Sequence, residues 1–156
     1  MRPSTIVVNE WIFHDIRGEN GWHAQERAGL FLQALKEAPD RVVVQRGSRW
    51  TEKAWALWRE TDARVQVLSK FLYLGILIDA QKCVYLGPDQ VQDLPPDLAA
   101  RVPADDIYLF QAALAGGANI IVTTDERLVG AVEAARDHGI QMSLRDVFMA
   151  ERYSIF

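Results

Sequence analysis

Short apolar runs rich in β-branched residues alternate along the chain with longer segments in which apolar residues recur at helical spacing. The runs suited to strands cover residues 5–8, 41–45, 84–86, 119–122 and 140–143. Helical spacing covers residues 22–37, 50–59, 63–80, 105–116, 126–138 and 144–153, whereas residues 11–21 suit a loop or a short helical turn. This alternation predicts a single domain, residues 1–156, with a three-layer α/β/α fold around a central, mainly parallel sheet.

Acidic residues stand where one predicted helix begins and where one predicted strand ends. Asp105 and Asp106 open the helix at 105–116, and Asp125 closely follows the strand at 119–122. Open α/β sheets bind ligands at the carboxyl ends of their strands, so we expect these acids to meet at one edge of the sheet. A simpler role is open to each of them, because Asp is also favoured as a helix cap and in the first helical turn.

Carboxylates gathered at one sheet edge repel each other in a partly dry cleft, and a divalent cation relieves that repulsion. Mg²⁺ and Mn²⁺ are hard ions that bind through a few carboxylates plus water. A metal held in this way orients a phosphate, generates hydroxide and stabilises the leaving oxygen. The acids therefore favour phosphodiester hydrolysis as the candidate reaction.

One segment resembles the C-terminal half of a PIN domain and covers about a sixth of the chain: D-D-I-Y-L-F-Q-A-A-L-A-G-G-A-N-I-I-V-T-T-D-E-R-L. That family shows an Asp, a helix rich in small residues, a Gly-containing turn, an apolar strand and then Thr-x-Asp. The resemblance places Asp106 at the helix acid, Thr123 at the hydroxyl position and Asp125 at the strand-tip acid. It implies a PIN-like fold and a ribonuclease that depends on Mg²⁺ or Mn²⁺, with Thr123 orienting a carboxylate or a water molecule.

Two further positions of a PIN site lie earlier in the chain. The family has an Asp at the end of its first strand, where this sequence has Asn9, a neutral residue that contributes less to cation binding. It also has a Glu early in the helix after the second strand, a position that Glu52 fits best and Glu60 less well. Glu10 could compensate for Asn9, although along an extended strand it would face away from it. The implied metal ligands are Asp106, Asp125, Glu52 and Asn9, with Asp105 as a substitute for Asp106.

The composition indicates an ordinary globular protein. Hydrophobic residues make up 49% and charged residues 24% of the 156 residues, and the net charge is −4. A lone Cys83 excludes an internal disulfide and a cysteine-based metal cluster. The longest apolar run, residues 71–78, is too short to span a bilayer, and the N-terminus lacks the apolar core of a secretion signal. These features predict a cytoplasmic protein without a membrane partner.

Residues 41–70 form the basic part of the chain, with seven Lys or Arg residues against three Asp or Glu. Trp50, Trp55 and Trp58 are interleaved with these cations, an arrangement suited to phosphates and unpaired bases. Core packing is the expectation for Trp50 and Trp58, whereas Trp55 lies off the apolar stripe and is expected at the surface or at a subunit contact. The predicted contacts to RNA phosphates are Arg46, Arg49 and Lys53.

Three functions follow from these observations. The first is a PIN-like Mg²⁺/Mn²⁺-dependent endoribonuclease acting on single-stranded or looped RNA. For it the resemblance also implies a homodimer and, as in the bacterial toxins of the family, an antitoxin protein. The second is an RNA-binding or regulatory module in which Asn9 has weakened or abolished cleavage. The third is a small-molecule α/β protein, which predicts a closed apolar pocket in place of an open acidic groove.

Overall fold

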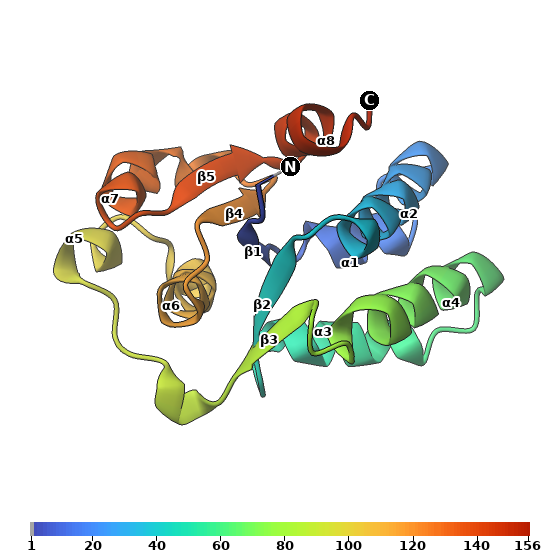
Figure 1. Cartoon of the computed structure of the whole chain (residues 1–156), viewed down its shortest axis with the longest axis horizontal. Helices are drawn as coiled ribbons and strands as arrows, with labels where there is room; N and C mark the ends of the chain where they lie inside the picture. The colour runs from blue at the N-terminus through green and yellow to red at the C-terminus, as the bar shows by residue number, and fades with distance from the viewer. Residues whose placement is uncertain (1) are drawn as a thin grey trace.

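A five-stranded parallel sheet in the order β3-β2-β1-β4-β5 lies at the centre of the molecule (Figure 1). The structure is a computed structural model that describes residues 2–156, apart from the side chain of Val129. The strands are β1 (Thr5–Val8), β2 (Arg41–Gln45), β3 (Cys83–Leu86), β4 (Ile120–Thr123) and β5 (Gln141–Leu144). All five predicted strands are present, and their boundaries agree with the prediction to within one residue.

Helices cover both faces of the sheet and complete the predicted three-layer α/β/α fold (Figure 1). One face carries α1 (Trp11–Ile16), α2 (Trp22–Glu37), α3 (Arg49–Trp58), α4 (Ala63–Lys70) with its π-helical continuation η1 (Phe71–Leu77), and α8 (Arg145–Tyr153). The other face carries α5 (Pro96–Ala99), α6 (Ile107–Gly116) and α7 (Val132–Asp137). Short 3₁₀ turns are η2 (Pro88–Gln90), η3 (Ala104–Asp106) and η4 (Glu126–Ala131). Among residues 2–156, no helix has the length and apolar character needed to cross a bilayer.

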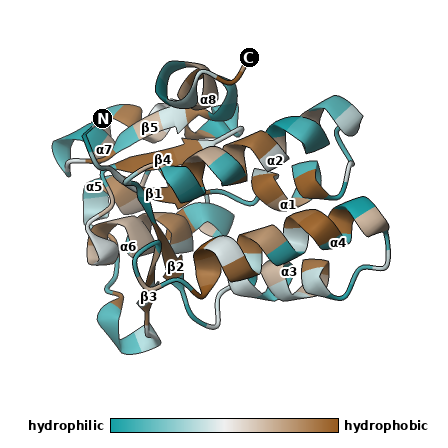
Figure 2. Cartoon of the chain, turned by 45° about the vertical axis from the view of Figure 1, so that its right-hand side comes forward, coloured by the Kyte–Doolittle hydropathy of each residue, from teal (hydrophilic) through white to brown (hydrophobic). Residues whose placement is uncertain are grey.

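Aliphatic side chains of the central strands form the core between the two helical layers. Ile6 of β1 pairs with Val42 of β2 on one side and with Ile120 of β4 on the other. Strands inside such a sheet are covered on both faces, so they are marked in the sequence by continuous apolar runs and not by alternation. Figure 2 shows hydrophobic residues concentrated on these strands.

Two glycines at the end of α6 have different functions in the fold. A Cβ atom on Gly116 would overlap the side chain of Val43 in β2, so the helix and the strand can pack at this distance only with glycine. Gly117 ends α6 in the left-handed conformation with φ of 69°, as the sequence predicted. The packing of α6 fixes where its N-terminus, and with it Asp106, meets the strand ends.

The structure corrects three helical segments. Residues 11–21 contain the helix α1, because Glu10 already has helical backbone angles and the side chains of α1 are largely buried. Residues 63–80, predicted as one α-helix, change to a π-helix after Lys70, where the wider turns keep Leu72, Ile76 and Leu77 buried. Residues 126–138, also predicted as one helix, begin with the 3₁₀ turns of η4 before α7.

The three tryptophans of α3 differ in their burial. Trp50 is buried in the core as predicted, and its indole nitrogen donates to the carbonyl oxygen of Val8 at 2.8 Å. Trp55 is 52% exposed, also as predicted. Trp58 was expected in the core, but it is 36% exposed and packs at the surface against Tyr73. The buried residues of α3 are Trp50, Ala54 and Leu57, and Trp58 is the last residue of the helix.

Candidate functional site

The chain reverses its direction across the sheet between β1 and β4. From β1 it proceeds to β2 and β3 on one side, and it then returns to β4 and β5 on the other. Open α/β sheets bind ligands beside such a position, at the carboxyl ends of the two strands. Asn9 directly follows β1 and Thr123 is the last residue of β4, so both lie at this edge of the sheet. The candidate site is built around them.

Thr123 links the ends of the two strands through its hydroxyl group. Its Oγ1 atom accepts a hydrogen bond from Nδ2 of Asn9 at 2.9 Å and another from the backbone N–H of Asp125 at 3.0 Å. Oδ1 of Asn9 accepts from the backbone N–H of Glu10 at 2.6 Å. Thr123 therefore positions the loop that carries Asp125, and both polar ends of the Asn9 amide are engaged.

Asp106 brings a carboxylate to the same edge from the other helical layer. Only 5% of the residue is exposed, and its Oδ2 atom is buried without a hydrogen-bond partner. Burial raises the pKa of Asp106, and the negative charge of Asp125 raises it further, while Arg127 and Arg49 oppose the shift less strongly. Its neighbour Asp105 is exposed, and only the Asp105 backbone carbonyl oxygen contacts this region, as an acceptor from Arg49. Asp106 is therefore the acid of the adjacent pair that belongs to the site.

Asp125 is held by an arginine two residues further along the chain. Its carboxylate accepts from the guanidinium of Arg127 at 2.6 Å and from the Arg127 backbone N–H at 2.9 Å. These hydrogen bonds lower the pKa of Asp125, and burial opposes them only in part. Because the Arg127 side chain is 71% exposed, water and salt screen this ion pair and a competing cation can displace it at little cost.

Glu10 contributes a carboxylate at the same edge of the sheet, but both of its oxygens already bind side chains of the protein. It accepts from Nε of Arg49 at 3.0 Å, from Nζ of Lys53 at 2.5 Å and from the hydroxyl of Tyr108 at 2.8 Å. Burial alone would raise the pKa of Glu10, but the hydrogen bonds from these three side chains outweigh it and lower the pKa. Two internal cations thus neutralise this acid.

The expectation that Glu10 faces away from Asn9 is wrong. Glu10 does not continue the extended strand: its φ and ψ are −70° and −4°, and it begins α1. The turn of the backbone directs both side chains to the same edge of the sheet, where Asn9 contacts Thr123 and Glu10 contacts α3. Strand geometry therefore does not apply beyond Val8.

Helix α3 presents cations to the carboxyl edge of the sheet, and Glu52 lies on a different face of this helix. Arg49 and Lys53 are four residues apart and share the face that contacts Glu10. Glu52 is about 100° around the helix from Lys53, is exposed, and lines a separate hollow with Trp55. The predicted ligand Glu52 is thus not brought together with the aspartates. Glu60, the weaker choice, forms an ion pair with Arg17 at 3.3 Å.

The oxygen donors at this edge of the sheet are of the kind that binds a divalent cation. The free oxygen of Asp106 and the weakly held carboxylate of Asp125 are hard donors of the kind that Mg²⁺ prefers. Within residues 2–156, no group of three His, Cys, Asp or Glu side chains is arranged to hold a metal. Asp106 and Asp125 are therefore the residues at this edge whose oxygens could hold a metal ion.

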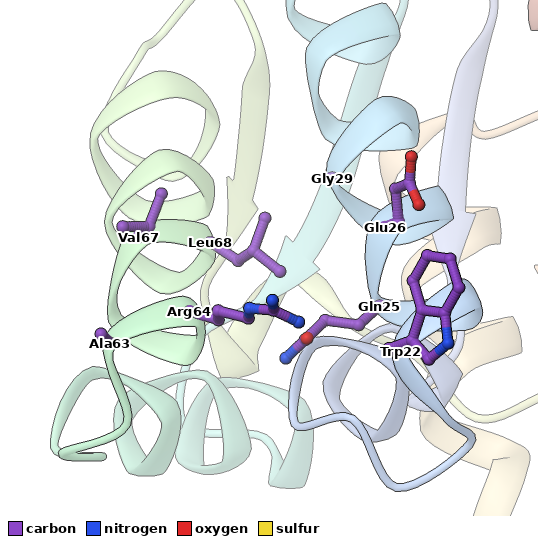
Figure 3. Close-up of a pocket in the computed structure, with 8 residues that line it drawn as sticks. All are labelled: Trp22, Gln25, Glu26, Gly29, Ala63, Arg64, Val67 and Leu68. Carbon is purple, nitrogen blue, oxygen red and sulfur yellow. The ribbon is translucent and has the colours of Figure 1, made fainter.

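A second hollow, of about 530 Å³, lies between α2 and α4, away from the acids (Figure 3). Trp22 and Val67, which line it, are each 67% exposed. Figure 3 shows Arg64 and Leu68 extending from α4 toward α2. An apolar hollow thus exists, but it is an open surface groove and not the closed pocket at the sheet edge that a small-molecule protein would require.

Comparison with known proteins gave no matching family model, no matching curated protein and no matching solved structure. The site therefore has to be interpreted from its own geometry. Sequence reasoning missed the contributions of Tyr108 and Arg127 and misplaced that of Glu10. A signal for the cations was present, because Arg49 and Lys53 stand four residues apart on a helix that follows a strand.

Proposed function

We propose that the protein is a PIN-like endoribonuclease that hydrolyses unpaired RNA with a single Mg²⁺ or Mn²⁺ ion. The observation that carries the proposal is the buried Oδ2 atom of Asp106, which lacks a partner and lies beside the carboxylate of Asp125. An unpartnered buried carboxylate oxygen is costly, and a bound cation offsets that cost. The proposal also draws on the sequence resemblance at residues 105–128.

In this proposal Asp106 and Asp125 hold the metal ion, and Asn9 offers a weaker third oxygen. When bound, the ion supplies a polarised water and charge stabilisation at the phosphate. Water adds to phosphorus as one phosphoester P–O bond breaks, and the departing oxygen takes up a proton. Thr123 keeps the strand ends in register through its hydrogen bonds to Asn9 and Asp125, so it acts as a positioning residue.

The cations at the rim suit a negatively charged substrate. Arg127 is exposed beside Asp125, and the side chains of Arg49 and Lys53 are 43% and 34% exposed beside Glu10. A phosphate that approaches the metal comes within reach of these groups. In this proposal Arg49 and Lys53 contact RNA phosphates, although both cations also bind Glu10.

The experiment is a Mn²⁺ titration followed by calorimetry, paired with cleavage of a 5′-labelled single-stranded RNA. Asp106→Asn and Asp125→Asn should each lower the rate at least about 100-fold and weaken Mn²⁺ binding, because each removes a direct ligand. Glu60→Gln is the matched control, since Glu60 lies at the Arg17 ion pair away from the aspartates. If Mn²⁺ neither binds nor supports cleavage by the wild-type protein, the proposal is wrong.

A second function, an RNA-binding module without cleavage, is favoured by a different observation. The edge holds Lys53 and Arg49 in contact with Glu10, and Asn9 takes the place of an acid. With fewer carboxylates and more internal cations, the edge would bind phosphate more readily than metal. Salt-dependent RNA binding without Mn²⁺ binding, and cleavage that appears only after Asn9→Asp, would support this second function.

A protein partner belongs to the proposal as well, either an antitoxin or a second copy of the chain. The groove between α2 and α4 offers exposed apolar surface for such a contact at Trp22 and Val67. Light scattering of the purified protein and of Trp22→Ser tests the second copy: a dimer that dissociates in the variant places the partner there.

A further inference from the structure

A hollow of about 370 Å³ lies beside α3, separate from the aspartates. It is lined by Arg46 at the end of β2, by Glu52 and Trp55 of α3, and by Tyr73 and Tyr85. Its volume lies within the range of small-molecule sites and suits one planar ring system. We propose that this hollow binds an unpaired guanine base of the RNA. The inference rests on the proposed function for the nature of the polymer, but it does not depend on cleavage.

Aromatic side chains give the hollow flat surfaces. The ring of Trp55 stacks on that of Tyr73, with centroids 5.5 Å apart and an interplanar angle of 30°. Trp55 nevertheless remains 52% exposed, so much of its indole surface is available to a ligand. Stacking of bases on exposed aromatic rings is the usual way in which proteins hold unpaired nucleotides.

A cation at the other side of the hollow extends this stacking surface. The guanidinium of Arg46 lies over the ring of Tyr85, 4.5 Å from its centroid. Arginine planes stack on bases and also attract the phosphate of the same nucleotide. This places Arg46, one of the residues predicted to contact RNA, at the hollow and not at the acids.

Glu52 selects the base. Within residues 2–156 its carboxylate has neither an ion-pair partner nor a hydrogen-bond donor at bonding distance, although cations lie on both sides of it in the sequence. A carboxylate accepts two parallel hydrogen bonds from a planar group that carries adjacent donors. Guanine presents such a pair, N1–H and the 2-amino group, on one edge, whereas uracil presents a single donor there. In this inference Glu52 recognises a base and is not the metal ligand that the sequence predicted.

Helix α3 connects the hollow with the acidic edge. One of its faces presents Arg49 and Lys53 to Glu10, and the adjoining face presents Glu52 and Trp55 to the hollow. An RNA strand crossing the N-terminal half of α3 can therefore place one base in the hollow while the neighbouring phosphate reaches the cations. The two faces adjoin, because Glu52 and Lys53 are about 100° apart around the helix.

The test measures binding in EDTA, which separates it from metal-dependent cleavage. Short fluorescent RNAs of uridine that carry one central guanosine, adenosine or cytidine are titrated by fluorescence anisotropy. We expect the guanosine RNA to bind about tenfold more tightly than the others, with Glu52→Gln removing the preference and Trp55→Ala weakening the binding of all RNAs. Trp55→Phe is the matched variant, because it keeps a flat ring and should retain the preference. Circular dichroism confirms that each variant is folded.

Equal affinity for all the RNAs, or a guanosine preference that survives Glu52→Gln, overturns the inference. Free guanosine monophosphate tests whether a nucleotide alone is the ligand: if it binds as tightly as the RNA, the polymer is not recognised and the inference is wrong. A change of oligomeric state in Trp55→Ala, seen by light scattering without any change in RNA affinity, would assign this surface to a subunit contact and equally overturn it. A guanosine preference without Mn²⁺-dependent cleavage would support this inference while contradicting the proposed ribonuclease.

Discussion

Two buried aspartates, Asp40 and Asp106, lie at opposite edges of the sheet and differ in their hydrogen-bond partners. Asp40 precedes β2 at the amino edge and is fully buried, and Asp106 lies at the carboxyl edge with 5% exposure. Asp40 accepts hydrogen bonds from Nε of Arg152 at 2.7 Å, from the hydroxyl of Tyr153 at 2.6 Å and from the backbone N–H of Ser4 at 2.9 Å. Asp106 has a buried oxygen with no partner and a like charge beside it.

The difference separates an acid whose oxygens are hydrogen-bonded by the protein from one that has a buried oxygen without a partner. The partners of Asp40 come from the start of the chain and from α8, so this carboxylate ties both ends of the chain to the sheet. The carboxylate of Asp106 does not link other parts of the described chain in this way. Its charged form is disfavoured in the folded protein. In the proposed function, this unsatisfied oxygen is the atom that binds the metal ion.

Removing the charge at each aspartate gives the largest expected contrast. Asp40→Asn should lower the free energy of unfolding by about 3 kcal/mol, because it leaves the partly buried Arg152 without its counter-ion. Asp106→Asn should leave that energy unchanged or raise it, since it removes repulsion and no hydrogen bond. Urea unfolding followed by tryptophan fluorescence measures both. A loss of stability in Asp106→Asn as large as that in Asp40→Asn would contradict the comparison.

The fold could be predicted because its signals are local and repeated. The central strands β1, β2 and β4 are largely apolar runs, and Gly117 ends α6 where a left-handed residue is required. For residues 11–21 the sequence left a loop or a short helical turn open, because Gly18 and Gly21 stand in the segment, whereas burial of Trp11 and Ile16 in the folded core stabilises the helix α1. That burial depends on distant parts of the chain, so no local pattern indicates it.

The candidate site was predictable only in part, for the same reason. Asp106, Asp125 and Thr123 follow from their positions at element ends, which the topology brings to one edge. Glu52 was chosen by its distance from β2, but a shift of one residue on a helix turns a side chain by about 100°. Lys53, and not Glu52, therefore occupies the position that faces Glu10.

The two aspartates should also respond to pH in opposite directions. The pKa of Asp40 lies below its ordinary value of 3.8, because the Arg152, Tyr153 and Ser4 hydrogen bonds outweigh burial. Its contribution to stability is complete above that value and is lost as the pH falls through the folded-state pKa. The pKa of Asp106 lies above 3.8, so its stabilising contribution is present at lower pH and is lost as the pH rises through the folded-state pKa.

Urea unfolding of wild type and both Asn variants between about pH 3 and pH 7 tests this difference. The deficit of Asp40→Asn relative to wild type should shrink toward acid pH, where Asp40 becomes protonated in the wild-type protein. The advantage of Asp106→Asn should instead grow toward neutral pH, because Asp106 then carries its disfavoured charge in the wild-type protein. Parallel curves for the two variants would show that the environments of the aspartates do not differ as their contacts indicate.

The smallest effect is expected for Asn9→Asp, a variant that tests whether a further carboxylate strengthens metal binding at the carboxyl edge of the sheet. In Asn9→Asp the new carboxylate would lie beside the two aspartates, and the Thr123 hydroxyl, which now accepts from Asn9, can donate its own hydrogen to it. The variant should bind Mn²⁺ about tenfold more tightly, which corresponds to about 1.4 kcal/mol. It should also be less stable than wild type without metal, because three carboxylates then repel each other. Calorimetric titration compares it with Glu60→Gln, and an affinity equal to that of this control would mean that residue 9 does not reach the ion, which would leave Asp106 and Asp125 alone to hold it.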